Sequence, residues 1–176
     1  MKTRNAFATL TIYVLSALTI LDFVSLHKVQ AESTVEAESI RDCRKLVTGT
    51  YLTTLSTSTN FGRVRGILTF NRDGNFVTTA SIQGGVPKTP PFSNVQGSWK
   101  CTSSREITAT GLDFTYSTAT VPGSITRSDF RATFDPKDGI VQATATLKSF
   151  NLNANPLKDY APVQQTFTFT GQRIKP

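Results

Sequence analysis

The sequence predicts an all-β protein, an eight-stranded up-and-down antiparallel barrel that follows an N-terminal signal peptide. From Leu46 onward, β-branched and aromatic residues alternate with polar residues, which is typical of half-buried strands. Tight turns such as Asn71-Arg-Asp-Gly74 and Pro136-Lys-Asp-Gly139 join some of these runs, and long loops join the others. Because short and long connections alternate, all the tight turns fall at one end of the barrel and the long loops at the other.

The N-terminal segment, residues 1–31, has the three parts of a secretory signal. A short basic start precedes an apolar run from Ala6 to Leu21, and small residues surround Ala31. We expect cleavage after Ala31 and export to the periplasm or the cell exterior. The alternative is an uncleaved membrane anchor, since the run approaches the ~20 residues that span a bilayer. Asp22 disfavours that alternative, because a carboxylate inside a membrane is costly.

Cleavage would leave a polar segment, residues 32–45, and a barrel domain, residues 46–176. The polar segment is expected to be a loose tail or one short helix. In the barrel domain, period-two alternation and turn residues mark eight segments. The predicted strands are 46–56, 64–71, 75–82, 92–102, 105–116, 124–135, 139–149 and 165–174.

The two cysteines, Cys43 and Cys101, predict one disulfide in an oxidising compartment. Cys43 precedes the first strand and Cys101 ends the fourth. In a meander both positions lie at the end with the tight turns, so the barrel layout allows the bond. The alternative is a pair of buried thiols or one reactive thiol.

Composition argues against several functions. The net charge of +7 comes from scattered basic residues, which indicates a solvated surface rather than a nucleic-acid groove. The single histidine, His27, lies in the signal, so cleavage leaves no imidazole for catalysis or for zinc and copper. We therefore expect no metal and no cofactor, and the composition favours a binding protein over an enzyme without excluding catalysis.

One face of each strand should point into the barrel. In the fourth strand this is the face of Trp99 and Cys101, and in the last strand it is the face of Phe169 and Arg173. A charge on an apolar face needs a partner. A guanidinium group stacked on an aromatic ring is one solution.

Two short motifs carry a resemblance to a known family. Gly49-Thr-Tyr51 on the first strand and Gly171-Gln-Arg173 on the last resemble the closure of lipocalin-type barrels. The chain, with Gly97-Ser-Trp99-Lys100, is also similar to small secreted bacterial calycin-like barrels of mostly unassigned function. Tyr51 stands where lipocalins have Trp, so ligand specificity is not carried over. The resemblance implies a structural closure at the base by Gly49, Tyr51, Trp99 and Arg173.

We expect such a barrel to bind a small, largely apolar molecule at its looped end. Loops 84–91 and 155–162 are rich in Pro or Gly and suit a gate. Gly111 permits a bulge that would turn Leu112 and Phe114 inward. The aromatic residues expected to line the cavity are Phe70, Phe76, Phe114, Tyr116, Phe167 and Phe169.

Two other functions stay open, a cofactor-independent cyclase or isomerase and a filled barrel that acts as a cell-envelope interaction module. Asp113 and Asp129 fall in neighbouring predicted strands. The favoured interpretation is ion pairing on the outer face with Arg127 and Arg131. In the alternative, one carboxylate lies in the cavity with Tyr116 as an acid–base pair. No nucleic-acid partner and no membrane span after signal cleavage are expected, and the oligomeric state stays open.

Overall fold

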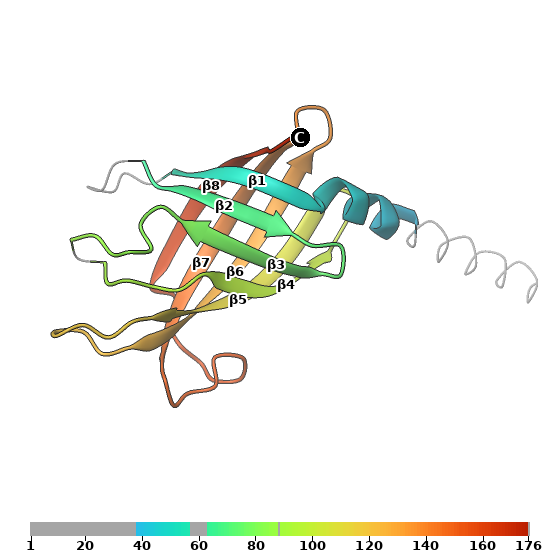
Figure 1. The fold of residues 1–176 in the computed structure, drawn as a ribbon. Helices are drawn as coiled ribbons and strands as arrows, with labels where there is room; N and C mark the ends of the chain where they lie inside the picture. Colours follow the sequence, from blue (N-terminus) through green and yellow to red (C-terminus); the bar gives the residue numbers. More distant parts are fainter. Residues whose placement is uncertain (1–37, 57–62, 88, 176) are drawn as a thin grey trace, which may run out of the picture. The chain divides into compact units, whose positions relative to one another are not determined.

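The computed structural model describes residues 38–56, 63–87 and 89–175 of the chain (Figure 1). The expected signal peptide and its cleavage site lie outside the described residues. Residues Ile40–Pro176 form one compact unit, and this unit contains all the strands that the structure describes. Within the described ranges no helix has both the length and the apolar character needed to cross a membrane.

The unit Ile40–Pro176 is a closed barrel of eight antiparallel strands in which each strand pairs with its neighbours along the chain. The last strand closes the barrel by pairing with the first, from Tyr51 opposite Arg173 to Ser56 opposite Thr168. This confirms the predicted all-β, up-and-down architecture. The strands are β1 (Gly49–Ser56), β2 (Arg65–Phe70), β3 (Asn75–Ala80), β4 (Val95–Cys101), β5 (Glu106–Thr115), β6 (Ser124–Asp135), β7 (Ile140–Asn151) and β8 (Gln165–Arg173).

The first strand starts later than predicted, because residues 38–47 are helical. Cys43 and Val47 lie four residues apart on one helix face, and both are fully buried. The Tyr51 hydroxyl donates hydrogen bonds to the carbonyl oxygens of Leu46 and Val47, at 3.3 and 3.0 Å. The predicted strand 46–56 wrongly included Val47, since positions 47 and 51 match both a helical and a strand period.

The helix and three tight turns lie at one end of the barrel, which we call the base. The predicted disulfide is present there and joins Cys43 to Cys101. Gly74 and Gly139 adopt φ values of 93° and 64° in the β2–β3 and β6–β7 turns, as an Asp-Gly turn requires. The opposite end, which we call the mouth, carries the longer loops.

Aromatic rings fill the barrel near the base. The ring of Phe70 lies 5.7 Å from that of Trp99 and 5.8 Å from that of Phe134, both in edge-to-face geometry. The Trp99 indole donates hydrogen bonds to the carbonyl oxygens of Asn71 (3.2 Å) and Asn75 (3.1 Å). Trp99 therefore ties the β2–β3 hairpin to β4 and has a structural role.

Arg173 completes the base closure. Its guanidinium carbon lies 5.5 Å from the centre of the Tyr51 ring, and the group donates a hydrogen bond to the carbonyl oxygen of Thr48. A β-carbon on Gly49 would lie only 2.8 Å from two guanidinium nitrogens, so the glycine leaves room for the arginine. The Tyr51 ring and the Thr48 carbonyl oxygen are therefore the partners of the Arg173 charge, which the sequence placed on the same face of β8 as Phe169.

The Arg173→Met substitution should lower the free energy of unfolding by about 2 kcal/mol. It removes the cation–π contact and leaves the Thr48 carbonyl without its charged donor. Equilibrium unfolding in urea measures the change, with Lys175→Met as the control for loss of an exposed positive charge nearby. Equal stability of the two variants would contradict a structural role for Arg173.

Candidate ligand cavity

The mouth half of the barrel encloses a cavity of about 340 Å³. Bulky rings occupy the inward positions near the base, whereas small side chains occupy many of those nearer the mouth. This difference in side-chain size leaves space in a barrel of eight strands, which is only just wide enough to be filled. Small residues that line the cavity are Thr53, Gly66, Thr78, Ala80, Ser128 and Ala145.

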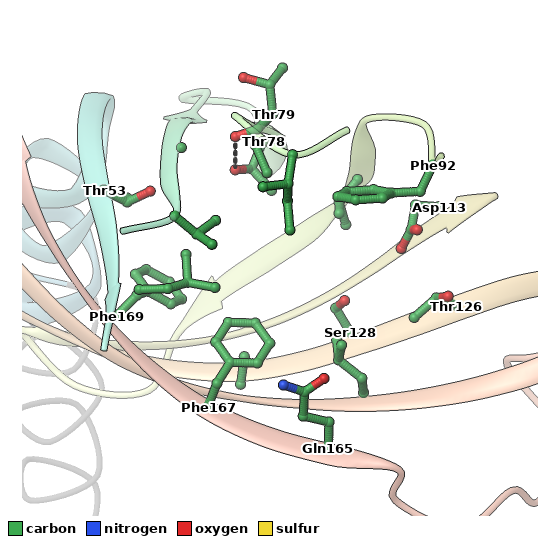
Figure 2. Close-up of a pocket in the computed structure, with 18 of the residues that line it drawn as sticks. Thr53, Thr78, Thr79, Phe92, Asp113, Thr126, Ser128, Gln165, Phe167 and Phe169 are labelled. Carbon is green, nitrogen blue, oxygen red and sulfur yellow. Dashed lines mark hydrogen bonds between the residues drawn. The ribbon is translucent and has the colours of Figure 1, made fainter. Parts of the chain in front are cut away.

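Apolar rings form the inner part of the cavity. Phe130 and Phe169 belong both to the buried core and to the cavity lining, with ring centres 6.2 Å apart. Phe167 lies 6.4 Å from Phe169 and extends this surface along β8 (Figure 2). Phe92, from the β3–β4 loop, lines the cavity as well. A ligand in this space would therefore contact mainly carbon.

A polar wall is formed by β5 and β6. Asp113 lines the cavity and is only 7% exposed. It pairs across the strands with Thr126, and Ser128 is the next residue on the same face of β6. The Thr126 hydroxyl lies 3.4 Å from that of Thr115, which also lines the cavity. Figure 2 shows Asp113, Thr126 and Ser128 facing the same space as Phe167.

No hydrogen bond or salt bridge reaches the carboxyl group of Asp113 from the residues that the structure describes. Burial raises its pKa from 3.8 to about 6, because desolvation disfavours the charged form. Asp113 is also the one titratable side chain among the described lining residues. The cavity thus holds a single carboxyl group that changes charge near neutral pH.

Asp129 behaves as the outer-face interpretation predicted. Its carboxylate accepts hydrogen bonds from the Arg127 Nε (3.0 Å) and the Thr110 hydroxyl (2.7 Å), and Lys148 Nζ lies 3.8 Å away. The same interpretation is wrong for Asp113. In the β5–β6 pairing Asp129 is opposite Thr110 whereas Asp113 is opposite Thr126, so the two carboxylates lie on opposite faces of the sheet.

Of the six aromatic residues expected to line the cavity, the structure places Phe167 and Phe169 along it. Phe70 and Phe76 are 1% and 3% exposed and pack in the core rather than along the cavity. Phe114 and Tyr116 are 54% and 52% exposed and do not line the cavity.

The predicted bulge at Gly111 is wrong. β5 pairs with β6 without interruption from Glu106 to Thr115, so strict alternation keeps Phe114 outward and Asp113 inward. Phe130 was not among the aromatic residues expected to line the cavity, although its alternation with Ala132 on β6 marks the inward face.

Of the two loops expected to form a gate, only the first reaches the cavity. Thr89 and Pro90 line it together with Phe92. None of the residues 155–162 lines it. The carbonyl oxygen of Pro156 instead accepts a hydrogen bond at 3.2 Å from Arg127, which points to the outer face with Asp129.

Neither a protein family, nor a curated protein, nor a solved structure matches this chain. Its closed eight-stranded antiparallel barrel is consistent with a lipocalin-like fold. The function therefore has to be inferred from the cavity itself.

Proposed function

We propose that the protein is an exported, lipocalin-like barrel that binds a small, largely apolar molecule in the cavity at its mouth. The observation that carries this proposal is the cavity itself, with a volume of about 340 Å³ and a mostly apolar lining. That volume lies near the lower end of the range for small-molecule pockets, and such pockets combine apolar walls with a few polar groups. The same volume disfavours a filled barrel.

Export is supported by the signal-like composition of residues 1–31 and by the bond between Cys43 and Cys101. Disulfides form and persist mainly in oxidising compartments. Both features fit a protein that acts in the periplasm or outside the cell.

Proton-transfer catalysis is the second candidate, and the observation that favours it is the cavity position of Asp113, with a pKa near 6. A general base needs its pKa near the working pH, which Asp113 satisfies. However, Tyr116, its expected acid partner, is 52% exposed and does not line the cavity. The cavity therefore supports binding better than catalysis.

The Ala145→Phe substitution should weaken binding of a neutral apolar probe, phenylbutanol, at least about tenfold, because the added ring occupies the cavity. Isothermal titration calorimetry measures the affinity. The matched control is Thr144→Phe, which adds the same ring on the adjacent exposed position of β7 and should leave binding unchanged.

Unfolding curves establish that both variants are folded. Equal weakening by both, or no uptake of the probe by the unmodified protein, would contradict the proposed function. Native mass spectrometry of the protein purified from its own host adds an independent measurement, since a co-purifying small molecule identifies the class of ligand.

A further inference from the structure

We propose that the ligand carries a protonated amine, which binds the Asp113 carboxylate and the neighbouring hydroxyl groups while its apolar body lies along Phe167 and Phe169. This inference rests on the proposed function and specifies the chemical class of the ligand.

The first argument is the isolation of Asp113. Asp113 is 7% exposed and lines the cavity, and within the described ranges it makes no hydrogen bond or salt bridge. A buried carboxylate is costly unless it is paired. Among the described lining residues there is no Lys, Arg or His to pair with it. A cationic group on the ligand would supply the missing charge.

The second argument is the arrangement of acceptors around that carboxyl group. An ammonium group has three N–H donors and needs three acceptors. Asp113 and Thr126 face each other across β5 and β6, and Thr115 and Ser128 line the cavity beside them. One carboxylate and two hydroxyl oxygens on this wall would satisfy all three donors.

The third argument is the polarity of the cavity. Figure 2 shows Asp113, Thr126 and Ser128 on one wall, and Phe167 and Phe169 farther along the same space. A molecule with a cation at one end and an apolar body fits this distribution. A fatty acid does not, because its carboxylate would lie near Asp113 without a basic residue in the described lining to balance the two charges.

The amine should bind more tightly as the pH rises through about 6, where Asp113 becomes ionised. Other groups do not account for this change. Thr126 on β6 lies opposite Asp113, Ser128 on β6 and Val95 on β4 line the same cavity, and none of the three carries a charge. Arg127 and Asp129 point to the outer face and pair with each other there.

The experiment compares three probes of one shape, phenylbutylamine, phenylbutanol and phenylbutyrate, by calorimetry with the full chain. At about pH 7.5 the amine should bind at least about tenfold more tightly than the alcohol, and the acid more weakly than the alcohol. In the Asp113→Asn variant the preference for the amine over the alcohol should vanish. At about pH 4.5 the unmodified protein should lose the preference too. The control Asp138→Asn changes an exposed turn carboxyl and should behave as the unmodified protein.

The results separate this inference from the proposed function. If the alcohol binds but the amine binds no better, or if Asp113→Asn keeps the preference, the amine inference is overturned and cavity binding stands. If the acid binds most tightly, the inference is likewise overturned. If none of the probes binds, both the inference and the proposed function fail.

Discussion

The Asp113→Asn substitution should remove a pH-dependent loss of stability of about 2 kcal/mol between about pH 4 and pH 8. Burial raises the pKa of Asp113 from 3.8 to about 6. At pH values between these two pKa values, the native state keeps a proton that the unfolded chain releases. The unfolded state then binds fewer protons, and the free energy of unfolding falls as the pH rises. The asparagine side chain does not ionise, so the variant lacks this component.

Urea unfolding of the ligand-free protein and the variant at several pH values measures the effect. The stability of Asp113→Asn relative to the unmodified protein should increase by about 2 kcal/mol from pH 4 to pH 8, whatever its offset at pH 4. Asp138→Asn, in an exposed turn, should follow the pH profile of the unmodified protein. Parallel profiles for all three proteins would show that Asp113 titrates normally and is not desolvated.

The barrel could be predicted because its signals are local. Period-two alternation marks the strands, and Asp-Gly at positions 73–74 and 138–139 marks two hairpins whose turn glycines have positive φ. The error at residues 46–47 has a local cause as well. Val47 and Tyr51 are spaced by four, which satisfies a helical turn and an alternating strand equally, and only the packing of Val47 beneath the barrel decides between them.

The cavity was harder to predict because it depends on the register between strands, which decides which inward side chains lie at the same height along the barrel axis. Strict alternation with Ile107 and Ala109 places Asp113 inward, whereas the bulge expected at Gly111 would have turned Phe114 inward instead. The uninterrupted β5–β6 register decides in favour of alternation. The register therefore leaves the Asp113 carboxyl group in a mostly apolar cavity. Departures from the preference for apolar residues in a core are expected at functional sites.

The double substitution Cys43→Ala and Cys101→Ala should lower the free energy of unfolding by about 4 kcal/mol, the chain-entropy value for a closed loop of this length. The two cysteines are separated by 58 positions, so the disulfide restricts a long stretch of the unfolded chain. Phenylbutanol affinity should be unchanged, because the disulfide lies at the base and the cavity at the mouth. Guanidinium unfolding measures the stability, and calorimetry measures the binding.

Reduction of the unmodified protein with dithiothreitol is the matched comparison, since it breaks the same bond without changing the sequence. A loss below about 1 kcal/mol in both cases would contradict a stabilising role for the bond. A loss of the expected size would be a large fraction of the roughly 5–15 kcal/mol that stabilises a typical domain. A bond that contributes this much to stability fits a protein that works in an oxidising compartment, where disulfides persist.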